Sequence, residues 1–248
     1  VSVSAIFLIA IGGALGDAIG SRGPFLMYLL AIPIALLVAW KLFEPAIIEK
    51  TSGLKGSLPW KSLAPLLLTT LGVGIFFYTA IVKLGDILLL TGDVTPGVIG
   101  GVGAVFNIGV MLGTILFIKL KTKSSGPKLL AIGMLLFAMG YAGMGLSGTF
   151  AMTVAFALIT SLGAGLLLPT MLTWVMSILP GNVRGRGTGL WTGMFFLGQF
   201  IAPLVAVALY KPAGGLSDVL LVYGIIAAVL MVVAVIGSRG AKPLTQAH

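Results

Sequence analysis

Residues 184–203 read RGRGTGLWTGMFFLGQFIAP, so that two arginines among glycines lead into an apolar stretch containing Gln199 and Pro203. Arginines beside an apolar run are typical of a turn at a membrane surface that leads into a membrane-spanning helix. We therefore interpret Arg184 and Arg186 as a cytoplasmic turn between two spans. An uncharged amide inside such a span requires a hydrogen-bond partner or water, because an unpaired amide is costly in hydrocarbon.

The composition of the whole chain supports this interpretation. Of its 248 residues, 58% are hydrophobic and only 8% are charged, whereas charged residues make up about 25% of a soluble domain. Eight apolar runs, each close to the length of about 20 residues that crosses a bilayer, lie at residues 1–19, 24–43, 62–82, 95–118, 127–146, 150–175, 188–209 and 218–237. Continuous runs of this length favour helices over membrane strands, which are shorter and alternate. We predict an all-α, polytopic bundle of eight transmembrane helices.

The distribution of lysine and arginine predicts the orientation of this bundle, because cytoplasmic loops carry the excess of these residues. Twelve fall on one side, namely Lys41, Lys50, Lys55, Lys61, Lys119, Lys121, Lys123, Lys128, Arg184, Arg186, Arg239 and Lys242, and three on the other, namely Arg22, Lys83 and Lys211. We therefore expect both termini in the cytoplasm. The net charge of +9 then reflects topology and contact with membrane lipid, and no nucleic-acid partner is expected.

The chain lacks residues that several enzyme classes require. It has no cysteine, and its one histidine is the terminal His248, so a thiolate metal site, a cysteine nucleophile and a Ser–His pair are all excluded. We expect no enzyme activity, no catalytic residue, no bound metal and no cofactor.

Four charged residues lie near the predicted outer ends of spans: Asp17, Lys83, Asp86 and Asp218. Their positions favour interfacial groups that remain hydrated.

Glycines recur four residues apart within several predicted spans. They are Gly12, Gly16 and Gly20, then Gly97 and Gly101, Gly109 and Gly113, and Gly189 and Gly193. This spacing places small residues on one helix face, where they let a neighbouring helix approach closely. We interpret these faces as packing surfaces, and a sliding gate is the alternative.

The polar groups that remain inside the spans are mostly uncharged. They are Tyr78, Asn107, Tyr141, Thr170, Thr173, Trp174, Trp191 and Gln199. Asn107 and Gln199 each lie about midway along a span, and we expect both to face the protein interior, since an amide facing lipid would be costly. They serve either as hydrogen-bonding contacts between helices or as the lining of a substrate cavity.

Two longer stretches resemble the major facilitator superfamily of transporters, in particular bacterial drug and arabinose-efflux-like permeases. Residues 169–203, PTMLTWVMSILPGNVRGRGTGLWTGMFFLGQFIAP, resemble its tenth to eleventh helix region, and residues 12–37, GGALGDAIGSRGPFLMYLLAIPIALL, resemble the end of its fifth helix and its sixth. In this register residues 1–43 are the last two helices of the N-terminal half, 44–61 the central cytoplasmic loop, and 62–248 the six-helix C-terminal half. The register implies about four further spans upstream, so we expect the chain to be incomplete as a transporter.

The resemblance also implies a function. It predicts a secondary active transporter in a bacterial-type inner membrane that moves a small organic solute by alternating access, with proton-coupled efflux and therefore protons as a further partner. The helices that face the cavity in this family carry, in this chain, the substrate-binding candidates Tyr78, Asn107, Thr170, Trp174 and Gln199. One alternative is an uptake permease of the same fold. Another is a non-transporting scaffold or receptor, which predicts amides that pair with each other and no cavity.

Overall fold

The computed structural model describes residues 2–41, 56–241, 243 and 244, and these residues form helices without a β-strand. The main helices are α1 (Ser2–Ile19), α2 (Ala31–Lys41), α3 (Trp60–Val82), α5 (Pro96–Leu120), α6 (Gly126–Leu146), α7 (Phe150–Ile178), α8 (Arg184–Ala213) and α9 (Leu216–Gly237). Three shorter helices connect them: η1 (Gly23–Leu30), α4 (Leu84–Leu89) and η2 (Gly181–Val183). The prediction of an all-α bundle is confirmed.

The predicted spans correspond to these helices one by one. Within the described residues, seven helical stretches are long and apolar enough to cross a bilayer, and the first predicted span is the shorter apolar helix Ser4–Ile19. The second span, Gly23–Lys41, consists of η1 followed directly by α2. The predicted central loop, residues 44–61, falls largely on residues 42–55, which lie outside the described part of the chain.

The start of α8 differs from the prediction. α8 begins at Arg184 rather than Thr188, so both arginines lie in its first turn, and the connecting turn is η2. The predicted Arg-Gly turn is therefore wrong in its position. The physical reason is that a long arginine side chain can extend along the helix to the membrane surface, so the helix need not end where its apolar run ends.

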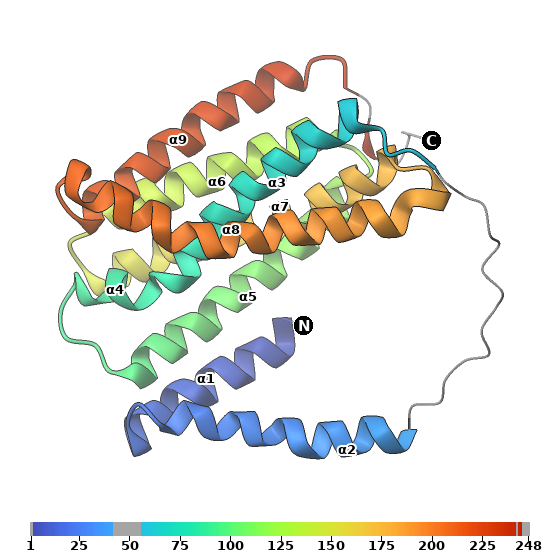
Figure 1. Cartoon of the computed structure of the whole chain (residues 1–248). Helices are drawn as coiled ribbons and strands as arrows, with labels where there is room; N and C mark the ends of the chain where they lie inside the picture. Colours follow the sequence, from blue (N-terminus) through green and yellow to red (C-terminus); the bar gives the residue numbers. More distant parts are fainter. Residues whose placement is uncertain (1, 42–55, 242, 245–248) are drawn as a thin grey trace.

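The helices run alternately between two ends of the molecule. We call them the Thr95 end, which carries the first residues of α5, and the Arg184 end, which carries the first residues of α8; they lie at the left and right of Figure 1. α3, α6 and α8 begin at the Arg184 end, and α5, α7 and α9 begin at the Thr95 end. This alternation places the described lysines and arginines at the Arg184 end, apart from Arg22, Lys83 and Lys211.

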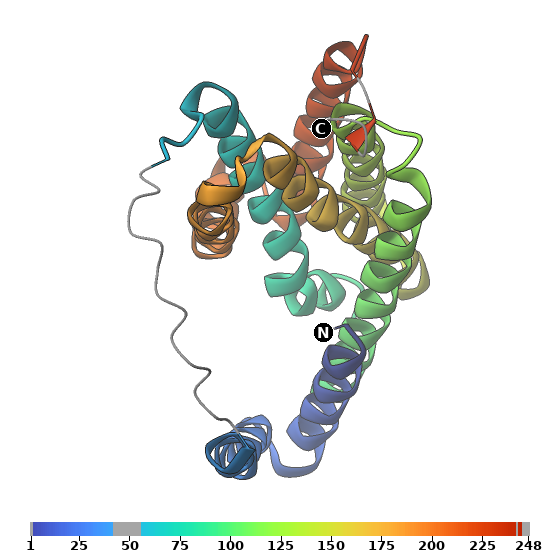
Figure 2. The same ribbon diagram turned by 90° about the vertical axis from the view of Figure 1, so that its right-hand side faces the viewer.

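The packing of the helices divides the molecule into a bundle and an attached pair. α3 packs on α8, α5 on α7, and α6 on both α7 and α9, while α1 packs on α5. Figures 1 and 2 show α1 and α2 at the edge of the molecule beyond α5, with α2 outermost. α2 buries none of its residues. Its exposed apolar surface fits a helix that faces lipid or other membrane helices.

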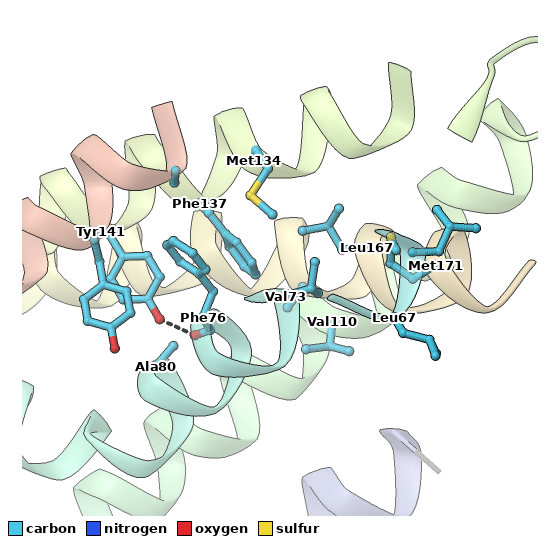
Figure 3. Close-up of a cluster of buried hydrophobic side chains, with 14 of the residues drawn as sticks. Leu67, Val73, Phe76, Ala80, Val110, Met134, Phe137, Tyr141, Leu167 and Met171 are labelled. Carbon is cyan, nitrogen blue, oxygen red and sulfur yellow. Dashed lines mark hydrogen bonds between the residues drawn. The ribbon is translucent and has the colours of Figure 1, made fainter. Parts of the chain in front are cut away.

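The core of the bundle lies between α3, α6, α7 and α9. Phe76 on α3 stacks on Phe137 of α6, with ring centroids 5.6 Å apart, and meets Tyr223 of α9 edge-on at 5.2 Å. The hydroxyl of the fully buried Tyr141 donates a hydrogen bond to the backbone oxygen of Phe76 (Figure 3). These contacts hold α3 in a fixed position, and α3 forms one wall of the candidate site.

Candidate functional site

A cavity of about 410 Å³ lies between α1, the junction of α3 and α4, and α5. Its lining is Ile9, Ile81, Val82, Leu84, Gly85, Ile99, Gly100, Gly103, Phe106 and Asn107. Asn107 is the one polar side chain among these residues, and none of them is charged. We call this space the Asn107 cavity. An apolar cavity with a single polar group is typical of a site for a small organic ligand.

Asn107 is half-buried, and α5 itself holds its side chain in place. Its amide nitrogen donates a hydrogen bond of 3.0 Å to the backbone oxygen of Gly103, one turn earlier in the helix. No hydrogen bond to its side-chain oxygen is recorded among the described residues, so this oxygen can accept one from a ligand. The prediction that Asn107 faces the interior agrees with its position in the cavity wall.

Close approach of α1 and α5 forms one side of the cavity. A Cβ on Gly13 would lie 2.8 Å from the Cα of Gly100, so the two backbones are in contact. One turn further along α5, a Cβ on Gly103 would lie 2.9 Å from Ile9 Cγ2. Of the predicted glycines, Gly16 and Gly97 take part in the contact between α1 and α5. Gly12 and Gly101 do not, and the closest backbone approach is through their neighbours Gly13 and Gly100. A periodic pattern identifies a small-residue face, but a shift of one residue turns that face by 100°.

Tyr78 and Gln199 lie on the paired helices α3 and α8, outside the Asn107 cavity. The Tyr78 ring packs on Phe195 at a centroid distance of 5.2 Å, and α8 meets α3 where Gly198 approaches Gly74. Gln199 follows Gly198 and points away from this contact. It is exposed, and no hydrogen bond of its side chain is recorded among the described residues. Gln199 therefore makes no contact between α3 and α8 in the described part of the chain, and its place in a substrate path stays a prediction.

Thr170 and Trp174 lie within packed regions of α7. Thr170 is fully buried, and its hydroxyl donates a 2.7 Å hydrogen bond to the backbone oxygen of Leu166. The Trp174 ring covers Gly126 at the start of α6, so closely that a Cβ on Gly126 would lie 2.5 Å from it. The structure therefore brings only Asn107 into the cavity, and the five predicted residues do not converge on one place.

Sequence reasoning missed the contribution of α1 to this cavity. Ile9 lines the cavity, but it is one of thirteen hydrophobic residues in the first predicted span, and no local signal distinguishes it from the others. Gly13, the glycine at which α1 contacts α5, is adjacent to Gly12 in the sequence. This pair of glycines was the one feature of the first span that could have indicated a close contact between helices. Among the described residues no three His, Cys, Asp or Glu side chains gather in a way that could hold a metal ion.

The chain is similar to known membrane transporters over much of its length. Residues 66–246 match the family model described as the Major Facilitator Superfamily. The chain is 28% identical over 104 residues to Multidrug resistance protein 3 of Bacillus subtilis, covering 42% of this chain and 20% of that protein. It is 34% identical over 90 residues to an uncharacterised MFS-type transporter of Mycobacterium tuberculosis, covering 36% of this chain and 16% of that protein.

Two solved structures share the arrangement of helices. The chain superimposes on a variant of the peptide transporter POT in complex with sulfate, with a TM-score of 0.59 and 19% identity, over 74% of this chain and 39% of that one. A second structure of the same variant gives a TM-score of 0.52 and 23% identity, over 71% of this chain and 37% of that one. At this identity the likeness concerns the fold. Each of these matches spans less than half of the other protein.

Proposed function

Because this chain belongs to the Major Facilitator Superfamily, we propose that it forms the substrate path of a secondary active transporter, with the Asn107 cavity as its substrate site. The observation that carries this proposal is the cavity itself, which lies between α1 and the helices α3 to α5. Transporters with repeated halves bind substrate near the middle of the membrane, between helices of the two halves. A cavity between an attached helix and a six-helix bundle fits that arrangement.

We propose that the two parts of the structure correspond to two halves of this fold. In this division α1 and α2, within residues 1–43, are the last two helices of the first half, and residues 62–248 form the six-helix second half. The glycine contact between α1 and α5 supports it, because it lets a helix of one part pack directly on a helix of the other. The alternation of basic residues supports a cytoplasmic Arg184 end in a bacterial-type inner membrane.

The lining of the Asn107 cavity suggests the class of substrate. Apolar walls without a charged group favour an uncharged or weakly polar organic molecule, and the free oxygen of Asn107 favours one with a hydrogen-bond donor. Efflux is the direction that the name of the Bacillus subtilis relative supports. Proton coupling is also part of the proposal. It rests on the family alone, and no carboxylate among the residues that line this cavity supports it.

The structure weighs against the scaffold alternative. A scaffold would pair its buried amides with each other, whereas Asn107 bonds within its own helix and Gln199 is exposed. A scaffold also predicts no cavity, whereas a space of about 410 Å³ lies between α1 and α5. An uptake permease would have the same cavity, and only the direction of transport separates it from an exporter.

The Asn107→Leu variant tests the site. Leucine has nearly the size of asparagine but no hydrogen-bonding oxygen, so the KM for export should rise about threefold to tenfold, as expected for one lost hydrogen bond. The measurement is export of a panel of uncharged lipophilic dyes from cells that express the gene, with the amount of membrane-inserted protein determined in parallel.

The matched control is Ile108→Ala, which changes the next residue on α5. Ile108 is 38% exposed and does not line the Asn107 cavity, so its KM should equal that of the parent protein. An Asn107→Leu protein that is inserted normally and exports every dye with unchanged KM would contradict the assignment of the site.

A further inference from the structure

The last turn of α1 carries a carboxylate that contacts the first turn of α5. Asp17 Oδ2 accepts a 3.0 Å hydrogen bond from the hydroxyl of Thr95, the residue that caps α5. The same hydroxyl oxygen accepts a hydrogen bond of 3.4 Å from the backbone N–H of Val98. The carboxylate also lies directly against Gly97, where a Cβ would overlap Oδ2. The contact thus depends on a hydroxyl at position 95 and on the missing side chain at position 97.

The start of α5 is a favourable place for this negative charge. The first backbone N–H groups of a helix lack partners within the helix and give its N-terminus a partial positive charge, which stabilises a nearby anion. The ion pair recorded among the described residues joins Lys83 and Asp86, three residues apart on neighbouring turns. Asp17 is not part of it, so the electrostatic partner of its carboxylate is α5 itself.

Asp17 also lies at the end of a continuous seam between the two helices. Moving toward the Thr95 end, Gly13 meets Gly100, then a Cβ on Gly16 would lie 3.0 Å from Pro96 Cβ, and then Asp17 meets Thr95. Ile99, the lining residue of the Asn107 cavity nearest to this end of α5, is four residues from Thr95. The carboxylate therefore contacts α5 about one helical turn beyond the cavity wall.

From these contacts we infer that Asp17 is a positioning residue that latches α1 onto the N-terminus of α5 and keeps the Thr95 end of the Asn107 cavity closed. Opening toward that end requires α1 to leave α5, which breaks the bond to Thr95 and separates the carboxylate from the helix terminus. The latch thus sets the balance between the closed and open states of this end. The inference rests on the proposed transport function for its biological role, but the contact can be tested without a transport assay.

The test is a distance measurement between labels on the two parts of the molecule. Ile19 and Leu146 are exposed at 56% and 74%, lie at the Thr95 ends of α1 and α6, and can each be replaced by a spin-labelled cysteine. The 248 residues contain no cysteine that would add background. The two states should give a shorter and a longer distance between the labels. In lipid nanodiscs, Asp17→Ala should raise the ratio of the population at the longer distance to the population at the shorter one by about twofold to fivefold, the effect expected of a charge at a helix terminus.

Two further variants separate the latch from a general loss of stability. Gly97→Ala should shift the ratio as Asp17→Ala does, because the methyl group displaces the carboxylate. In the Asp17→Ala background the same glycine change should add little, because the displaced group is already gone. Thr95→Val should also shift the ratio, and Thr95→Ser, which retains the hydroxyl, should restore the parent distances.

The controls are Gly101→Ala, which faces open space on the same helix, and Asp86→Asn, whose charge is paired within its own segment. Both should leave the distances unchanged. Additive effects of the Asp17 and Gly97 changes, or an Asp17→Ala protein with the parent distances, would overturn the latch. A latch that responds as expected in a protein that exports no dye would instead retain this inference and reject the proposed function.

Discussion

Tyr141 illustrates how single polar residues fix helices in this apolar molecule. Its side chain is fully buried, its ring stacks on Tyr223 at 5.2 Å, and its hydroxyl donates to the backbone oxygen of Phe76. Nearby, the hydroxyl of Thr79 donates to the hydroxyl oxygen of Tyr223 over 3.1 Å. Two hydrogen bonds therefore tie α3 to α6 and α9.

The Tyr141→Phe variant should be less stable by about 0.5–1.5 kcal/mol, because it removes one interhelical hydrogen bond and leaves the packing intact. The measurement is reversible unfolding in mixed micelles of increasing denaturing detergent. Tyr210→Phe is the matched control, because Tyr210 is 53% exposed and no hydrogen bond of its hydroxyl is recorded among the described residues. Equal stability of the Tyr141 variant and the parent would show that this bond does not support the core.

Asn107 and Gln199 show which property of a residue the sequence could predict and which it could not. Hydropathy and position predicted that Asn107 is an interior amide, and the structure places it in a cavity wall. The same reasoning applied to Gln199, which is exposed because its neighbour Gly198 occupies the face that packs on α3. The two residues have equivalent depth in their spans and opposite environments. Rotation about the helix axis decides between them, and an apolar helix carries no polar face from which this rotation can be read.

At the scale of the helix, glycine decides how closely neighbours approach. Gly113 contacts the backbone oxygen of Leu162, and Gly109 contacts Ser161, so the predicted close face of α5 is confirmed against α7. Gly189 and Gly193 form an equally regular face on α8, yet a Cβ added at either position would contact no other helix within 4 Å among the described residues. Spacing therefore predicted the faces, whereas their partners depended on the tertiary arrangement.

Two glycines of α8 make a matched comparison of this effect. A Cβ on Gly198 would lie 2.8 Å from the backbone of Gly74, so Gly198→Ala should push α8 away from α3 and lower stability by about 1–3 kcal/mol. Gly193→Ala has open space around it and should be neutral or slightly stabilising, since alanine favours the helix. Thermal unfolding in one detergent compares the two proteins. A Gly198 variant that unfolds at the temperature of the Gly193 variant would contradict the backbone contact.

At the scale of the whole molecule, the sequence predicted the helices well and their assembly incompletely. Apolar runs of bilayer length and the alternation of basic residues identified the spans and the two ends, because both follow from the cost of polar groups in hydrocarbon. The resemblance of residues 169–203 predicted the family, and the match over residues 66–246 confirms it. The cavity was not predictable, because it arises where α1 meets α5, helices that are far apart in the sequence.

Alternating access to the Asn107 cavity is tested most directly by labelling a cysteine in its wall. Ile81 lines the cavity from α3, and Ile81→Cys introduces one thiol into residues that contain none. In sealed vesicles, a membrane-impermeant maleimide should label this cysteine from either face of the membrane, in proportions that a transported dye changes. Leu112→Cys, on the exposed surface of α5 outside the cavity, should show no such change. Labelling of Ile81→Cys from one face only, whether or not dye is present, would contradict a cavity that opens alternately to both sides.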